Sequence, residues 1–177
     1  DSIFGNNRTA AGIPSQFAKL TGATVYNFGF GGTRGKSRSE NNGWNYFDGE
    51  ELSKAIATGN YTNQVNAIPT MSGVPGYFTN VVNDMKNFDF STVDYIICNY
   101  GTNDYTGGST STEYIAAIKT IITNILTAYP NIVFIKCTAA QRFIESGGKL
   151  VSSAEAAYLS GGENLKAFVD ADLTLRD

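Results

Sequence analysis

The sequence predicts an α/β fold in which parallel strands alternate with helices. The apolar run Val93–Cys98 is rich in β-branched residues and precedes a glycine, as expected of a strand buried on both faces. A second run, Ile132–Cys137, has the same character. Between them, Thr110–Pro130 carries apolar residues at helical spacing. The two strands are therefore expected to be parallel and joined by a right-handed crossover helix.

The first third of the chain is predicted to add a helix and another strand. Pro and Gly residues favour a helix from Ile13 to Gly22, with Phe17 and Leu20 on one face. The segment Ala23–Asn27 is predicted to be a strand that leads into a glycine-rich turn.

The middle of the chain is predicted to form two helices with an irregular segment between them. Asp48 is expected to cap a helix that ends at Gly59, and residues 60–73 are expected to be irregular. Pro75–Phe88 has the spacing of an amphipathic helix. The polar loop before these helices carries three aromatic side chains, Trp44, Tyr46 and Phe47.

The C-terminal half contains the strongest helix signal. Thr110 and Glu113 have the spacing of a capping box, which predicts that the crossover helix begins there. Ala154–Leu159 is expected to form a helical turn. A last helix is predicted from Asn164, with Leu173 among its inward-facing residues.

Composition limits the classes of function. The chain has 177 residues with 42% hydrophobic and 12% aromatic content, which predicts one folded domain over residues 1–177. A net charge of −3 without a basic block argues against a nucleic-acid partner, and no apolar run is long enough for a membrane span. Cys98 and Cys137 are expected to be buried free thiols. Few charges and many Asn, Thr, Ser and Gly residues favour an extracellular or particle-exposed protein.

The chain contains no histidine. Histidine is the side chain whose ordinary pKa lies closest to neutral pH. Acid–base chemistry near neutral pH must therefore use another group, or a residue outside these 177.

Three short segments at predicted strand ends carry the candidate chemistry: Asp1-Ser2, Gly29–Thr33 and Gly101–Asp104. In a parallel sheet such segments converge on one edge. A serine hydroxyl, backbone N–H groups of a glycine-rich turn and an asparagine amide would there form a nucleophile with an oxyanion hole.

These blocks, D-S-I-F-G-N, then V-Y-N-F-G-F-G-G-T, then G-T-N-D, resemble the SGNH or GDSL hydrolase family of serine esterases and lipase-like enzymes. The resemblance implies a three-layer α/β/α sandwich with a flavodoxin-like parallel sheet. It implies hydrolysis of acyl esters, with neither a metal nor a cofactor required. Carried over by position, Ser2 matches the nucleophile, while Gly32 and Asn103 match the oxyanion donors together with the Ser2 N–H.

Substrate contacts are expected from three aromatic residues, Trp44, Tyr46 and Tyr105. The loop Thr33–Asp48 is rich in Asn and Gly, which favours a polar substrate over a fatty acyl chain. The predicted substrate is therefore a small ester or an acylated carbohydrate, with acetyl as the favoured acyl group.

The chain departs from the family pattern at both ends. The Asp-x-x-His block that supplies the base in the family is missing, as is the Gly before Asp1. We expect the 177 residues to be part of a longer chain, and to be inactive or weakly active without the His block. Asp177 could be the first residue of that block, although Asn164–Asp177 fits better as a helix.

Structural roles compete with these functional ones. Ser2 could be a turn residue, Asn103 a loop amide, and Trp44 and Tyr46 could pack under their own loop. Asp104 is expected to be a structural hydrogen-bond acceptor. The basic residues Arg34, Lys36 and Arg38 are expected on a solvated loop face.

Two other functions remain open at this stage. A non-catalytic binding or structural module could use the same scaffold. A P-loop nucleotide site could be built from Gly31–Ser37, but Phe30 occupies the position of its first glycine and a poor helical sequence follows.

Overall fold

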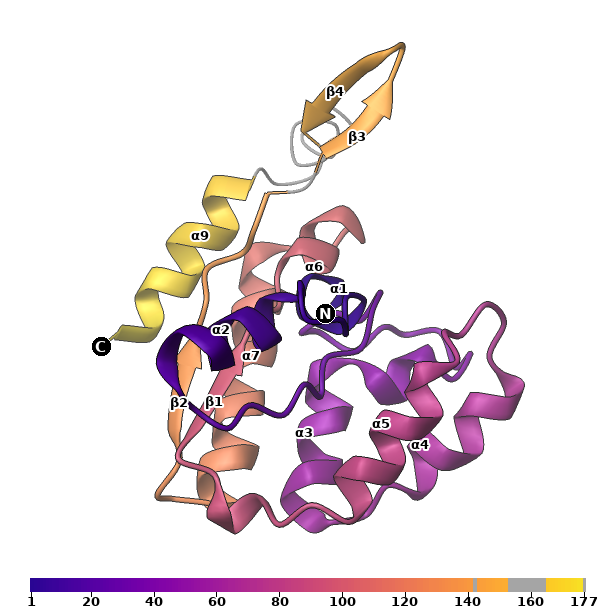
Figure 1. The fold of residues 1–177 in the computed structure, drawn as a ribbon. Helices are drawn as coiled ribbons and strands as arrows, with labels where there is room; N and C mark the ends of the chain where they lie inside the picture. Colours follow the sequence, from indigo (N-terminus) through magenta and orange to yellow (C-terminus); the bar gives the residue numbers. More distant parts are fainter. Residues whose placement is uncertain (142, 153–164, 177) are drawn as a thin grey trace.

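The computed structural model describes residues 1–141, 143–152 and 165–176 (Figure 1). The described residues are mainly helical. The α-helices are α1 (Ser2–Gly5), α2 (Ile13–Thr21), α3 (Gly49–Thr58), α4 (Thr62–Ala67), α5 (Tyr77–Lys86), α6 (Thr102–Thr106), α7 (Ser111–Ala128) and α9 (Leu165–Leu173). The 3₁₀ helices are η1 (Trp44–Phe47), η2 (Ile68–Thr70), η3 (Phe90–Thr92) and η4 (Thr174–Arg176). The strands are β1 (Tyr95–Cys98), β2 (Val133–Lys136), β3 (Phe143–Ser146) and β4 (Lys149–Ser152).

The predicted strand–helix–strand unit is confirmed. β1 and β2 pair in parallel, from Tyr95 opposite Val133 to Cys98 opposite Lys136. α7 connects them, and its capping box forms as expected between Thr110 and Glu113. The chain is therefore of the α/β class, with a small parallel sheet.

Helices cover one face of this sheet. Phe134 of β2 packs against the core cluster that contains Tyr114 and Ile118 of α7 and Phe168 of α9. Because side chains alternate along a strand, the neighbours of Phe134 lie on the opposite face. That face is open among the described residues: Tyr95 is 61% exposed and Val133 52%. The prediction that Val93–Cys98 is buried on both faces is therefore wrong for this structure.

The predicted strand Ala23–Asn27 is also wrong, because this segment is irregular. The hydrogen bonds that the structure shows for its backbone come from side chains rather than from a neighbouring strand. The Arg8 guanidinium donates to the carbonyl oxygens of Asn27 at 2.7 Å and Gly29 at 2.5 Å. In turn, the Asn27 amide donates to the Phe4 carbonyl at 2.7 Å. These bonds fix the segment beside the N-terminal residues, although it forms no β-sheet hydrogen bonds with another described strand.

The predicted helix Ile13–Gly22 forms as α2 and ends on Gly22, whose φ of 75° is typical of a left-handed cap. Its apolar face is not covered by the described residues. Phe17 is 42% exposed and Leu20 83% exposed. The helix therefore forms from its local signals although its apolar side chains pack against little of the described chain.

A core of aromatic rings fills the space between α3, α4 and α5. The rings of Phe30, Phe47 and Phe78 lie with centroids 4.8 to 5.1 Å apart, in tilted or edge contacts. α5 points Phe78, Val81, Val82 and Met85 inward, as its helical spacing predicted.

Several elements were not predicted from the sequence. Residues 60–73, expected to be irregular, contain α4 and η2. β3 and β4 form a hairpin whose turn residues Gly147 and Gly148 have φ of 59° and 72°. Two glycines with positive φ are the usual signal of such a turn. The helical turn predicted at Ala154–Leu159 lies outside the described residues, as does the Asn164 cap of α9.

Cys98 and Cys137 are free thiols as expected, but only Cys98 is fully buried, and burial raises its pKa to about 11. In the described part of the chain, no helix is both long and apolar enough to cross a membrane. Within the same residues, no group of three or more His, Cys, Asp or Glu side chains is placed to hold a metal ion.

Asp172 joins α9 to the sheet and to α7. Its carboxylate accepts hydrogen bonds from the Tyr114 hydroxyl at 2.7 Å and the Ala139 N–H at 2.9 Å. It also pairs with the ammonium group of Lys136 at 3.1 Å, and both side chains are almost fully buried. Sequence analysis did not predict this buried pair, because acidic residues on a terminal helix usually face solvent.

Asp172→Ala leaves the buried Lys136 ammonium without its carboxylate, so we expect a loss of about 3–5 kcal/mol in the free energy of unfolding. Urea denaturation measures this loss. Asp170→Ala is the matched control, because Asp170 lies on the same helix in an exposed pair with Lys166. We expect the control to change stability by less than about 0.5 kcal/mol. Equal losses in the two variants would contradict the role of Asp172.

Candidate active site

Ser2 is the first residue of α1. The Asp1 carboxylate caps this short helix by accepting the Ile3 N–H at 3.0 Å. Ser2 is half-buried, and its hydroxyl makes no hydrogen bond to another described residue. The N–H groups of a first helical turn have no partner within the helix, so the Ser2 N–H also remains a donor.

α1 lies directly against the second block. A Cβ on Gly5 would lie 2.6 Å from the carbonyl oxygen of Gly29, so only glycine allows this approach. A second link runs through the Tyr77 hydroxyl, which accepts the Gly31 N–H at 2.7 Å and donates to Asn6 at 3.0 Å. The helix that carries Ser2 therefore has a fixed position relative to the glycine-rich turn.

The third block is joined to the second by Asn103. Gly101 turns the chain from β1 into α6 with a φ of 127°, where a Cβ would clash with Ala139. One side-chain N–H of Asn103 donates to the Thr33 carbonyl at 2.8 Å. A primary amide has two N–H groups, so this bond orients the amide and leaves its second N–H as a donor.

Gly32 directly precedes Thr33, whose carbonyl accepts the bond from Asn103. It is exposed, has a φ of 79°, and its N–H has no hydrogen-bond partner among the described residues. The Gly32 carbonyl, in contrast, accepts a hydrogen bond from the Arg38 guanidinium at 2.9 Å. The Trp44 ring lies next to it, 3.4 Å from the place a Cβ would occupy. Gly32 thus presents an unpaired N–H at a surface lined by an aromatic ring.

The structure brings the three blocks together. Block one touches block two at Gly5 and Gly29, and block two touches block three at Thr33 and Asn103. Block one also lies near block three, because the backbone nitrogen of Asp1 is within electrostatic range of Cys98 and Asp104. Among the described residues, no hydrogen bond joins Ser2 directly to Gly32 or Asn103.

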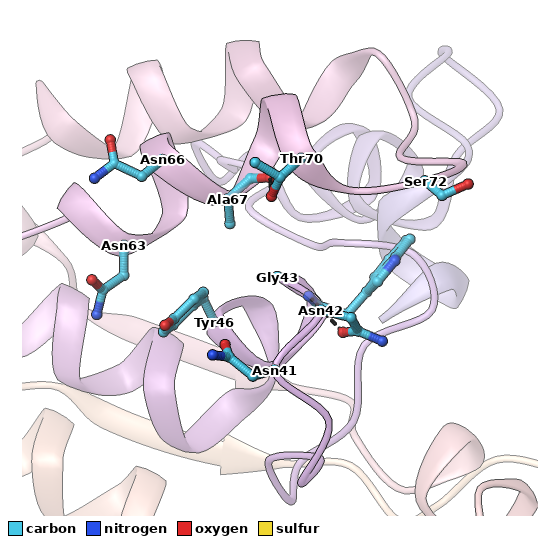
Figure 2. A pocket seen from close by; sticks show the side chains of 10 residues that line it. Asn41, Asn42, Gly43, Tyr46, Asn63, Asn66, Ala67, Thr70 and Ser72 are labelled. Carbon is cyan, nitrogen blue, oxygen red and sulfur yellow. Dashed lines mark hydrogen bonds between the residues drawn. The ribbon is translucent and has the colours of Figure 1, made fainter.

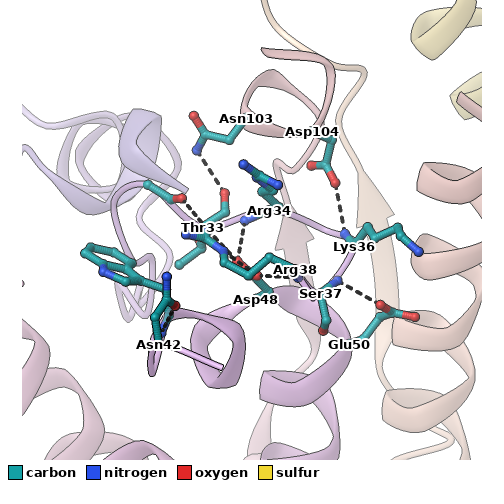
Figure 3. A network of polar contacts seen from close by, with 12 residues as sticks. Thr33, Arg34, Lys36, Ser37, Arg38, Asn42, Asp48, Glu50, Asn103 and Asp104 are labelled. Atoms are coloured by element: carbon teal, nitrogen blue, oxygen red, sulfur yellow. Dashed lines mark hydrogen bonds and ion pairs between the residues drawn. The ribbon is translucent and has the colours of Figure 1, made fainter. Parts of the chain in front are cut away.

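The loop between Gly32 and α3 is held by three carboxylates, which we call the carboxylate clamp: Asp48, Glu50 and Asp104 (Figure 3). Asp104 accepts the N–H groups of Gly35 at 2.8 Å and Lys36 at 2.9 Å. Its structural role as an acceptor is therefore confirmed. Glu50 accepts the Ser37 N–H at 2.8 Å.

Asp48 holds the two ends of the clamped loop. It accepts the backbone N–H of Arg34 at 2.9 Å and of Arg38 at 3.0 Å. It also receives two bonds from the Arg38 guanidinium. Asp48 occupies the N-cap position of α3 as predicted, but its side chain makes no cap bond. Arg38 is only 12% exposed, so the solvated position predicted for it is wrong.

The clamp argues against a P-loop. A phosphate site needs free backbone N–H groups in its glycine-rich loop. Here every backbone N–H from Arg34 to Arg38 already donates to a carboxylate of the protein.

Burial dominates the electrostatics of the clamp. Desolvation raises the pKa of Asp104 to about 6, and the N–H groups of Gly35 and Lys36 oppose this shift. Desolvation likewise raises the pKa of Asp48, against its bonds from Arg38 and Arg34. Both carboxyl groups are fully buried, so loss of charge is easier than in water.

The three predicted substrate contacts have different positions. Trp44 and Tyr46 line a surface hollow, and the Trp44 ring also lies next to Gly32. Tyr105 is only 2% exposed, its ring packs against Phe168, and its hydroxyl donates to the Ala140 carbonyl at 3.2 Å. The structure therefore gives Tyr105 a place in the core rather than at a binding surface. Phe47, the third aromatic residue of the loop, is fully buried.

Sequence reasoning missed Arg8, Tyr77, Asp48 and Glu50 as residues that position the site. No local pattern marks them, because each acts on a segment distant in the sequence. No protein-family model, curated protein or solved structure matches the chain. The family resemblance therefore rests on the three blocks themselves.

Gly5→Ala tests the contact between the first two blocks. The added methyl meets backbone atoms that cannot rotate away, so we expect a loss of about 1–3 kcal/mol in the free energy of unfolding. The matched control is Gly76→Ala, where φ is −57° and no atom lies within 4 Å of the new Cβ. Urea denaturation should show the control unchanged or slightly more stable. A neutral Gly5→Ala would contradict the close approach.

The raised pKa of Asp104 gives a pH prediction. Between about pH 4 and the folded pKa of about 6, the folded state keeps a proton that the unfolded state releases. Stability from this group is therefore complete below pH 4 and is lost as the pH rises through 6. The loss is on the order of 2–3 kcal/mol at 1.36 kcal/mol per pKa unit.

Asp104→Asn isolates this contribution, because it removes the titrating group at nearly constant size. Urea denaturation at pH 4, 5.5 and 7 should show the wild type losing part of its stability advantage over the variant as the pH rises. An advantage that is constant, or that grows with pH, would show that Asp104 titrates normally.

Proposed function

We propose that the chain is an ester hydrolase domain of the SGNH type, with Ser2 as its nucleophile. The observation that carries the proposal is the bond from the Asn103 amide to the Thr33 carbonyl. It fixes a donor from the third block beside Gly32, whose own N–H has no partner among the described residues. An oxyanion requires N–H donors that converge on one point, and we propose that the second Asn103 N–H and the Gly32 N–H do so.

The proposed reaction has two steps. The Ser2 oxygen attacks the ester carbonyl carbon, and the hydroxyl proton passes to a general base. The tetrahedral oxyanion then accepts hydrogen bonds from the N–H groups of Gly32 and Ser2 and from the Asn103 amide. Collapse expels the alcohol with a proton from the base, and water removes the acyl group from Ser2 in the same way.

The base is the part of this reaction that the 177 residues do not supply as histidine. Loss of one triad member typically costs several orders of magnitude in turnover. We therefore expect slow hydrolysis by this chain alone, and faster reaction when an imidazole base is added.

The favoured substrate is an acetyl ester on a carbohydrate. Support comes from the hollow beside Gly32, whose walls are polar and aromatic rather than aliphatic. A non-catalytic binding module is the second candidate, and the lack of histidine in these 177 residues favours it only if no His block follows Asp177. The two functions differ in whether the Ser2 hydroxyl reacts.

A fluorophosphonate probe tests this difference. We expect the 177-residue chain to be labelled at Ser2, faster with added imidazole, and Ser2→Ala to lose the label. Peptide mass spectrometry locates the modified residue. Ser15→Ala is the matched control, because Ser15 is also half-buried in the first turn of a helix. Imidazole-dependent labelling that is absent, or equal at Ser2 and Ser15, would refute the esterase proposal.

A further inference from the structure

A surface hollow of about 560 Å³ lies between the loop 41–46 and the helices α4 and η2 (Figure 2). We call it the amide hollow, after the four asparagines in its wall: Asn41, Asn42, Asn63 and Asn66. Its volume is within the range of sites that bind small molecules. Two separate segments of chain contribute asparagines, so the amides approach the space from both sides.

The lining selects a neutral ligand. No charged side chain is among the residues that line the hollow. Within the described structure, the amides of Asn41, Asn63 and Asn66 have no hydrogen-bond partner, and Asn42 uses only its oxygen, which accepts the Trp44 N–H at 3.1 Å. Each amide offers donors and an acceptor, which suits hydroxyl groups that also do both. A phosphate or carboxylate would find no opposite charge here.

Aromatic residues complete the wall. Tyr46 lies between Asn41 and Asn63 in Figure 2, and Trp44 also lines the hollow. An aromatic face carries negative charge density, which attracts the C–H groups on the flat face of a sugar ring. Aromatic faces beside amides therefore match a ligand with apolar C–H faces and a rim of hydroxyl groups.

The walls are held in place by the fold. The edge contact of Trp44 with Phe78, at 5.6 Å between centroids, fixes the indole. The buried Gln64 side chain donates to the Tyr46 carbonyl at 2.7 Å. Gly43 has a φ of 88°, and a Cβ there would lie 2.6 Å from Met71. The loop at Gly43 therefore packs closely against Met71, which follows η2. Because this packing needs no ligand, the hollow has its width before a ligand binds.

Trp44 connects the hollow to the candidate active site. Its ring lines the hollow and also lies 3.4 Å from the Cβ position of Gly32. We propose that the amide hollow binds a neutral oligosaccharide, and that a sugar held there presents its ester at Gly32. The second half of this proposal rests on the proposed function, whereas the binding of the oligosaccharide does not.

NMR titration of the Ser2→Ala chain with cellohexaose, xylohexaose and chitohexaose tests the binding, with oligogalacturonate as the acidic comparison. We expect at least one neutral probe to shift the side-chain amide signals of Asn41, Asn63 and Asn66. The double variant Asn63→Ala with Asn66→Ala should bind it at least about tenfold more weakly. Asn80→Ala, an exposed asparagine on α5, is the control and should stay within about twofold.

The outcomes separate this inference from the esterase proposal. Binding of the acidic probe alone, no binding of any neutral probe, or equal affinity in the double variant and the control would overturn the amide hollow. Amide shifts without labelling of Ser2 would retain the hollow and refute the esterase. Labelling of Ser2 without amide shifts would retain the esterase proposal and refute the amide hollow.

Discussion

The carboxylate clamp is the constraint on which the rest of the site depends. A buried carboxylate is unfavourable unless it is hydrogen-bonded or paired. Asp48 and Asp104 are fully buried and meet this requirement with backbone N–H groups of one loop, helped by Arg38. The loop cannot change its conformation without leaving these charges unsatisfied. Gly32 and Thr33 directly precede the clamped residues, so their position is fixed as well.

Hydrogen bonds from side chains also explain why the N-terminal segment is ordered without a strand. Arg8 satisfies two carbonyl groups of the segment that ends at Gly29, and its guanidinium also lies 4.3 Å from the centre of the Tyr77 ring. Tyr77 in turn bridges Asn6 and Gly31. Polar bonds between segments distant in the sequence thus replace the hydrogen bonds of a strand, and they place α1, which carries Ser2, beside the glycine-rich block.

The sequence predicted the elements whose signals are local. The capping box of α7, the apolar face of α5 and the Gly22 end of α2 each depend on a few neighbouring residues, and all three formed. Ala23–Asn27 did not become a strand, because a strand also needs a partner with a free edge, which no local pattern supplies. Asp48 fits a cap by sequence, yet distant N–H groups in the loop outcompete the cap. The three blocks meet, but by a different route from the predicted one: only the third follows a described strand, and polar contacts join the first two. The clamp and the amide hollow were not predicted.

One loop links these features. The loop runs from Gly32 to Phe47. Gly32 offers an N–H donor at its start, and the backbone N–H groups of residues 34–38 donate to the carboxylate clamp. Its last part forms one wall of the amide hollow. Trp44 lines the hollow and its ring lies next to Gly32, so the hollow and the proposed oxyanion donor share one side chain. Because the clamp makes this loop rigid, the distance between ligand and donor is set before binding. That is the condition under which binding energy from a remote part of a substrate can assist the reaction at its ester.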